Sequence, residues 1–346
     1  MLNQDHSIEV INLTKYYGPV MAIHEVSFNV EKGEIVGFLG PNGAGKSTTM
    51  RILCGLITAK SGSAKICGIP IASNPDEIKR RIGYMAENNP LPEDMRVVEY
   101  LYYRGHLKEI PRKRLKSRVE ETLELCDLNR TARRKVISTL SKGYRQRVGI
   151  ADAILSEPEV IIMDEPTIGL DPHQVLMIRD LINNLRGKMT VIISSHILSE
   201  VELCCDRVII INQGHIVACG TSESLRNEFI NTTTYTLNLK GNTSALDYLL
   251  REIDPDLEIS SSLSVVNDDY YDLELTTPHM RNLSEEILTR LYEHPQFRVR
   301  ELRRKVPNLE DIFLAATRRS WDEDIPLSNN KVDRGKKNNQ ETAAVE

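Results

Sequence analysis

The sequence lacks the cysteine and charge patterns that mark several classes of protein. None of its six cysteines is spaced C-x-x-C, and the adjacent Cys204 and Cys205 lie in a helix-like run, so no disulfide framework is indicated. Its 44 Lys and Arg residues stand against 49 Asp and Glu residues, which gives a net charge of −5. This balance argues against a chain-wide electrostatic grip on nucleic acid, and no nucleic-acid partner is expected.

Long apolar runs are also missing. The opening residues, MLNQDHSIEV, have neither the basic segment nor the apolar core of a secretion signal, and every uncharged apolar run is far shorter than the roughly 18 residues of a membrane-spanning helix. We therefore expect a soluble protein of the reducing cytoplasm that does not itself cross a membrane. The 346 residues leave room for a core of about 200 residues and a second, smaller domain.

Short apolar runs predict the strands of the larger domain, residues 1–225. These runs are residues 35–39, 160–163, 190–196 and 206–212. Because they alternate with helix patterns, they predict an α/β core, with a parallel sheet covered by helices on both faces. Residues 97–128 have helical periodicity throughout, and they predict a helical subdomain inserted at about 90–155.

From residue 232 onward the pattern changes. Strand-like and helix-like runs follow one another in the order β-α-β-β-α-β, which predicts a small accessory α+β domain at 232–320 with a closing helix at its end. Residues 321–346 contain few apolar side chains and are expected to be disordered.

The sequence GPNGAGKS, residues 40–47, fits the phosphate-binding pattern G-x-x-x-x-G-K-[ST]. It follows a strand run and opens a helix pattern, which is the context that distinguishes a real phosphate loop from a chance match. Backbone N–H groups of the loop would cradle phosphate oxygens, Lys46 would bridge the β- and γ-phosphates, and the Ser47 hydroxyl would bind Mg²⁺. The predicted nucleotide-binding residues of this segment are Gly40, Pro41, Asn42, Gly43, Ala44, Gly45, Lys46, Ser47 and Thr48.

Two acidic residues and a histidine follow other predicted strands. Asp164 is the expected Mg²⁺-side carboxylate and Glu165 the candidate general base, because ligands of α/β sheets bind at the carboxyl ends of the strands. An acidic helix cap is the alternative for this pair. His196 ends another strand run, so a γ-phosphate contact is favoured over a structural role.

Together these motifs resemble the ATP-binding subunit of an ABC transporter over about residues 8–220. The resemblance implies ATP and Mg²⁺ as cofactors, with Lys46, Glu165 and His196 as catalytic residues. It makes LSKGYRQR, residues 140–147, the signature motif, TIGLD at 167–171 the D-loop ending in the nucleotide-contacting Asp171, and His196 the switch histidine. It also makes Tyr17 the aromatic residue that stacks on adenine, with Tyr16 as the alternative.

The signature motif explains why a phosphate site would be split. Ser141 lies 95 positions after Lys46 (141 minus 46), across the helical insert. In the family, two nucleotide-binding domains pack head to tail, so Ser141 and Gly143 of one subunit would close over ATP held by the other. A capped surface helix is the alternative for an isolated Ser-x-Gly.

The chain departs from the family pattern at a few positions. Lys142 and Tyr144 replace the usual Gly and Gln of the signature, but Ser141 and Gly143 remain, so hydrolysis is expected to survive. Glu87 stands where the family has its Q-loop glutamine, and its carboxylate could ligate Mg²⁺ with different charge and geometry.

These variants and the single cassette resemble the exporter branch whose ATPase and membrane subunits are separate chains, as in drug, polysaccharide and gliding-motility systems. The resemblance implies a transmembrane permease as partner, a second nucleotide-binding domain in a homodimer or heterodimer, and a peripheral place on the inner face of the cell membrane. Residues 84–101 are expected to face the permease through Glu93 and Arg96, with Val97, Val98 and Leu101 in the subdomain core.

Two other functions compete with transport. One is a mechanical or regulatory ABC ATPase that acts on a membrane complex without moving a solute, which the sequence does not distinguish. The other is a soluble ABC ATPase, but ribosome-acting members usually carry two cassettes, and the phosphate-loop pattern occurs once here. The DNA-repair members insert a long coiled coil before the acidic strand, and the 118 positions from Lys46 to Asp164 (164 minus 46) leave no space for one.

Overall fold

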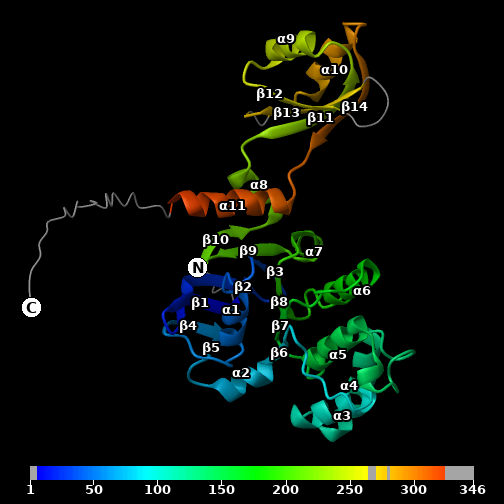
Figure 1. Ribbon diagram of the computed structural model, residues 1–346. Helices are drawn as coiled ribbons and strands as arrows, with labels where there is room; N and C mark the ends of the chain where they lie inside the picture. The colour runs from blue at the N-terminus through cyan, green and yellow to red at the C-terminus, as the bar shows by residue number, and fades with distance from the viewer. Residues whose placement is uncertain (1–5, 264–269, 279–280, 324–346) are drawn as a thin grey trace, which may run out of the picture.

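The computed structural model describes residues 6–263, 270–278 and 281–323 (Figure 1). Across these residues the strands form three sheets, with orders β2-β1-β4-β5, β10-β9-β3-β8-β7-β6 and β12-β13-β11-β14. The strands of the six-stranded sheet are β3 (Ile35–Leu39), β6 (Ile82–Met85), β7 (Val160–Asp164), β8 (Thr190–Ser195), β9 (Arg207–Asn212) and β10 (His215–Gly220).

The six-stranded sheet confirms the predicted α/β core. Its strands β6, β7, β8, β3 and β9 are parallel, and β3 and β7 are buried along their whole length. The edge strand β10 is antiparallel to β9 and was not predicted. The polypeptide reverses direction between β9 and β10 at Gln213 and Gly214, whose φ values of 48° and 85° suit the two-residue turns that join antiparallel strands.

The two faces of this sheet pack against different layers. Along β7, Ile161 and Met163 pack with the helical layer, whereas Val160 and Ile162 pack with α1 (Lys46–Leu53) and the first antiparallel sheet. That antiparallel sheet comprises β1 (His6–Tyr17), β2 (Val20–Glu31), β4 (Ser61–Ile66) and β5 (Ile69–Pro70). Helices therefore lie against both faces, as predicted, but the antiparallel sheet that packs outside α1 was not predicted.

The inserted helical subdomain is built from several separate helices. They are α3 (Val97–Leu107), α4 (Arg112–Leu125) and α5 (Lys142–Ile154), with a short 3-10 turn at Ile137–Thr139; α2 (Pro75–Arg81) precedes β6, and α6 (Pro172–Asn183) follows β7. The helical periodicity of 97–128 corresponds to two helices, which are separated where Glu109 has a φ of 57° and Pro111 becomes the N-cap of α4. Asp152 of α5 accepts a hydrogen bond from Arg104 Nε of α3 at 2.9 Å, which ties the two helices together.

The accessory region follows the predicted order β-α-β-β-α-β. Its elements are β11 (Thr233–Lys240), α9 (Thr243–Ile253), β12 (Glu258–Leu263), β13 (Tyr271–Thr277), α10 (Ser284–Tyr292) and β14 (Arg298–Lys305). Neighbouring strands are antiparallel throughout, and Tyr235, Leu237 and Leu239 of β11 share a buried cluster with leucines of α9 and α10.

The last helix, α11 (Leu309–Glu323), lies between the accessory sheet and the six-stranded sheet (Figure 1). Its residues Leu309, Ile312 and Ala316 pack with Val201 of α7 (Leu198–Cys204) and Leu225 of α8 (Ser222–Phe229). The closing helix thus rests on the cassette rather than on the accessory sheet. Of the segment expected to be disordered, residues 321–323 belong to α11 and residues 324–346 lie outside the described residues. No helix in the described ranges has the length and apolarity needed to cross a membrane.

Candidate functional site

The phosphate-binding pattern forms a tight loop between β3 and α1. Gly43 and Gly45 have φ values of 82° and 111°, and a Cβ at Gly45 would lie 2.7 Å from the backbone oxygen of Ala22. Both positions therefore favour glycine. The first turn of α1 carries no acidic side chain, so its unpaired N–H groups and positive dipole end face the loop without an internal anion.

Lys46 is buried, with 6% of its surface exposed, and points back into this loop. Its Nζ donates hydrogen bonds to the backbone oxygens of Gly40 at 2.7 Å and Pro41 at 3.3 Å. It also lies 3.5 Å from Glu165 Oε1. A buried cation held by weak carbonyl acceptors and one carboxylate can exchange them for phosphate oxygens.

Ser47 and Asp164 meet across the gap between α1 and β7. Ser47 Oγ donates to Asp164 Oδ1 at 3.2 Å, and Ser194 Oγ of β8 donates to the same oxygen at 2.5 Å. Hydroxyl and carboxylate oxygens are the ligands that Mg²⁺ prefers, so this pair fits the ion. Ser194 was not predicted, because its position beside Asp164 exists only once β7 and β8 are adjacent.

Glu165 stands at the carboxyl end of β7 in an unusual backbone conformation. Its φ of 50° is rare for a residue with a side chain, and backbone outliers of this kind cluster at functional sites. The backbone N–H donates to the Ser194 backbone oxygen at 3.1 Å, which holds the conformation. The carboxylate is 5% exposed and its Oε2 lies 2.8 Å from His196 Nδ1. Glu165 is therefore flanked by Lys46 on one oxygen and His196 on the other.

These groups line a cavity of about 400 Å³. Its predicted lining residues are Pro41, Asn42, Gly43, Gly45, Lys46, Ser47, Thr48, Glu87, Glu165 and His196. Ala22 and Ile168 also line it and were not predicted, because single apolar residues in a turn carry no motif. Gly40 and Ala44 shape the loop from its buried side.

Ser141 and Gly143 lie elsewhere, at the N-terminus of α5, and are not among the residues that line this cavity. The helix begins at Lys142, with Ser141 as its N-cap. Gly143 packs so closely on α6 that a Cβ there would lie 1.3 Å from Gln174 Oε1. Asp171 accepts a hydrogen bond from the backbone N–H of Gln174 at 3.0 Å, so it caps α6.

The loop after β6 links the cavity to α5. Glu87 is exposed and lines the cavity. Two residues later, Asn89 Nδ2 donates to Gln146 Oε1 of α5 at 3.2 Å. The loop is therefore tied to the same helix that carries Ser141.

The predicted adenine-stacking residue is the least enclosed. Tyr17 ends β1 with 47% of its surface exposed, and Lys15 Nζ lies 5.6 Å from its ring centroid. Tyr17 and the alternative, Tyr16, are both outside the set of cavity-lining residues. The stacking role stays a prediction.

Comparison with known proteins agrees with this geometry. A family profile described as ABC transporter matches residues 23–168. Over 319 residues the chain is 34% identical to the linearmycin resistance ATP-binding protein LnrL of Bacillus subtilis, covering 90% of this chain and 99% of that protein. Over 326 residues it is 31% identical to the Nod factor export ATP-binding protein I of Rhizobium meliloti, covering 90% of this chain and 88% of that protein.

A solved structure is similar as well. The ATP-binding cassette MJ0796, described as a dimer in a post-hydrolysis state bound to ADP and Pi, matches with a TM-score of 0.57 and 26% sequence identity. The match covers 62% of this chain and 98% of that one.

Proposed function

The chain belongs to the family of ABC transporter ATP-binding proteins, it binds and hydrolyses ATP, and we propose that it powers an exporter whose membrane-spanning part is a separate protein. The observation that carries the proposal is the convergence of Lys46, Glu165 and His196 on one cavity at the N-terminus of α1. The relatives named for resistance and for Nod factor export support an export role.

In the proposed site, the phosphates of ATP lie against the N-terminus of α1. Lys46 exchanges its bonds to Gly40 and Pro41 for β- and γ-phosphate oxygens. The residues that would hold Mg²⁺ are Ser47, Asp164 and Glu87. When bound, it would neutralise charge on the phosphate oxygens.

Glu165 and His196 then perform complementary tasks. The Glu165 carboxylate accepts a proton from the attacking water, and its contacts with Lys46 on one oxygen and His196 on the other orient it for this task. His196 presents Nδ1 to Glu165, which leaves Nε2 for the γ-phosphate.

We further propose that two such domains close head to tail around two ATP molecules, as a homodimer or with a related chain. Ser141, Gly143 and the first N–H groups of α5 form a second anion site that the cavity of the same chain does not include. A two-fold contact would supply each ATP with one site from each chain. The dimeric structure of the similar cassette MJ0796 supports dimerisation.

The proposed domain boundaries are 1–225 for the ATPase domain, with a helical subdomain at about 90–155, and 232–320 for the accessory domain. Because α11 packs on α7 and α8, the polypeptide returns to the ATPase domain after β14. We propose that the protein sits on the inner face of the membrane through its permease.

The experiment that tests this function is sedimentation of two variants with and without ATP. Glu165→Gln keeps hydrogen bonding but removes basicity, so hydrolysis should fall by about 10²–10⁴ while ATP still binds and holds a dimer together. Adding Ser141→Arg should abolish the dimer without preventing ATP binding to the phosphate loop. ATP-dependent dimers in the double variant would refute the proposal that Ser141 of one chain contacts ATP held by the other. A monomeric Glu165→Gln protein would mean that closure requires the membrane subunits.

A further inference from the structure

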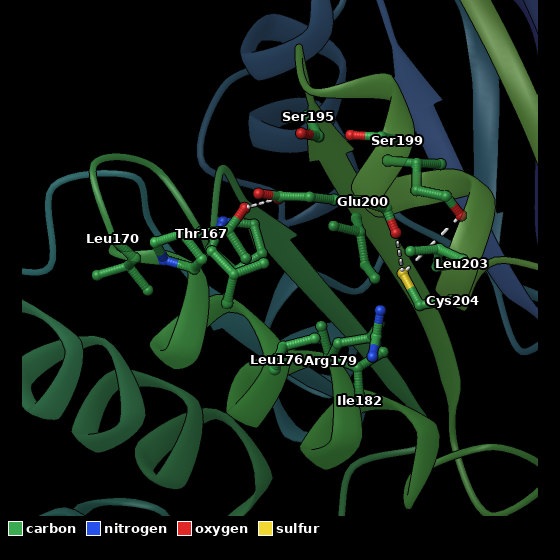
Figure 2. A pocket seen from close by; sticks show the side chains of 15 residues that line it. Thr167, Leu170, Leu176, Arg179, Ile182, Ser195, Ser199, Glu200, Leu203 and Cys204 are labelled. Carbon is green, nitrogen blue, oxygen red and sulfur yellow. Dashed lines mark hydrogen bonds between the residues drawn. The ribbon is translucent and has the colours of Figure 1, made fainter. Parts of the chain in front are cut away.

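A second cavity, about 400 Å³ in volume, lies between α6 and α7 (Figure 2). Its walls are largely aliphatic and include Leu170, Leu176, Ile182, Ile193, Val201 and Leu203. Two of these, Leu176 and Leu203, keep about half or more of their surface exposed, at 46% and 63%. The volume and the apolar lining are those of a site for a small organic molecule.

The polar groups of this cavity differ in how they are bonded. Thr167 Oγ1 donates a hydrogen bond to Glu200 Oε2, so that carboxylate is engaged at the D-loop. Cys204 Sγ donates to the Glu200 backbone oxygen at 3.2 Å. Figure 2 shows Arg179 rising from α6 toward Cys204, away from the Glu200 carboxylate. Within the described ranges, Arg179 makes no hydrogen bond or ion pair.

We infer that this cavity binds a small organic anion with an apolar body, namely a carboxylate on a hydrocarbon chain, with its head group on Arg179. A guanidinium without a partner offers a bidentate site to a carboxylate. The aliphatic walls would bury the hydrocarbon chain of the ligand away from water. A purely apolar ligand would leave Arg179 uncompensated, and a cation would meet it as a like charge.

The location predicts an effect on hydrolysis. Pro166 and Thr167 of the cavity wall directly follow Glu165, and Ser195 directly precedes His196. A ligand here lies behind the pair of residues assigned to catalysis rather than in the phosphate cavity. It should therefore lower the turnover number for ATP without competing with ATP, by fixing the D-loop through the Thr167–Glu200 contact.

Binding is tested with decanoate below its micelle concentration, by calorimetry on the full chain without nucleotide. Decan-1-ol, with the same chain length and no charge, is the matched ligand and should bind more weakly. Arg179→Met keeps the aliphatic bulk and should weaken decanoate binding by about ten- to a hundredfold, the factor for one charge-assisted contact. Arg179→Lys should restore part of the loss. Equal decanoate affinity in wild type and Arg179→Met, or equal affinity of decanol and decanoate, would overturn the inference.

Thiol labelling locates the ligand. Cys204 lines the cavity, and hydrogen bonding from the Cys205 thiol lowers its pKa. Decanoate should slow alkylation of Cys204 in wild type but not in Arg179→Met, and should leave the exposed Cys219 unaffected. Equal protection of both cysteines would place the ligand elsewhere. Because this assay requires neither ATP nor a dimer, its outcome is independent of the proposed export function.

Discussion

At the scale of single residues, the site depends on a few short contacts between groups from different strands. Ser194 is the clearest case, because it donates to Asp164 at 2.5 Å and accepts from the Glu165 backbone N–H at 3.1 Å. One hydroxyl thereby positions both adjacent acids. The positive φ of Glu165 directs its side chain to the Lys46 side of the sheet edge, and the same hydroxyl helps to hold it there.

Lys46→Ala should weaken ATP binding by about ten- to a hundredfold, because it removes the charge that would meet the β- and γ-phosphates. Equilibrium binding of a fluorescent ATP analogue measures the loss. Lys113→Ala, which removes an exposed lysine outside the phosphate cavity, is the control and should retain near-normal affinity. Unchanged affinity in Lys46→Ala would refute the assignment of the phosphate loop.

Asp164→Asn should lower Mg²⁺-dependent turnover by about a hundredfold or more, because the neutral amide no longer balances the ion. A magnesium titration of the ATPase rate checks this. Ser194→Ala provides a graded comparison, since it keeps the Asp164 carboxylate but removes one of the two hydroxyl groups that donate to it. The ATPase rate of Ser194→Ala should lie between those of the wild type and Asp164→Asn. If Asp164→Asn follows the wild-type magnesium curve, Asp164 does not take part in holding the ion.

At the scale of helices and strands, apolar runs were sufficient to predict β3, β7, β8 and β9, because buried parallel strands are apolar on both faces. The antiparallel sheet was not predicted. Bulges near Asn12 and Glu25, both at positive φ, break the alternation that would have marked β1 and β2. The phosphate loop and its two acids were predicted from sequence motifs. Ser194 and Ile168 could not be predicted in this way, because their roles exist only once β7 and β8 are adjacent.

The helix α7 connects the site to the accessory domain. It follows His196 after one residue, and Thr167 donates to its Glu200. On the other side of α7, Glu202 accepts a hydrogen bond from the backbone N–H of Leu309 at 3.4 Å. The Glu202 carboxylate also lies 3.8 Å from a guanidinium nitrogen of Arg226. Arg226 Nε in turn donates to the backbone oxygen of Pro307 at 2.9 Å. The first and last strands of the accessory domain begin and end close to each other, because Thr234 of β11 pairs with Lys305 of β14.

Replacing residues 233–305 by a short Gly/Ser linker should therefore leave ATP binding intact while changing the ATPase rate or assembly, because α11 stays docked. Truncation after residue 231 is the matched comparison. It removes α11, exposes Val201, Ile210 and Leu225, and should lower the melting temperature. Calorimetry and ATP binding of both proteins check the prediction. Loss of ATP binding in a linker variant with normal circular dichroism would show that the accessory domain belongs to the site.

At the scale of the whole molecule, a large groove of about 750 Å³ lies between α2, the ends of α3 and α4, and the end of α5. Its basic residues are Lys79, Arg80, Arg104, Lys108, Arg114 and Arg118, against Asp76, Glu109 and Glu157. Tyr84 at the end of β6 also lines it, so the groove adjoins the segment at 84–101. Each of these six basic residues forms an ion pair with a carboxylate of this chain. We propose that an acidic segment of the permease binds in the groove by exchanging for some of these carboxylates.

Arg114→Glu should weaken association with the permease and make it less sensitive to salt, because the substitution reverses a charge on the rim of the groove. ATP binding should not change, since the phosphate cavity is lined by other residues. Arg134→Glu makes the same charge change at an exposed position outside the groove and is the control. The measurement is the amount of permease recovered with the tagged chain from solubilised membranes over a range of salt concentrations. Equal recovery with both variants would exclude the groove, and a loss confined to Arg96→Glu would place the contact on the segment at 84–101 instead.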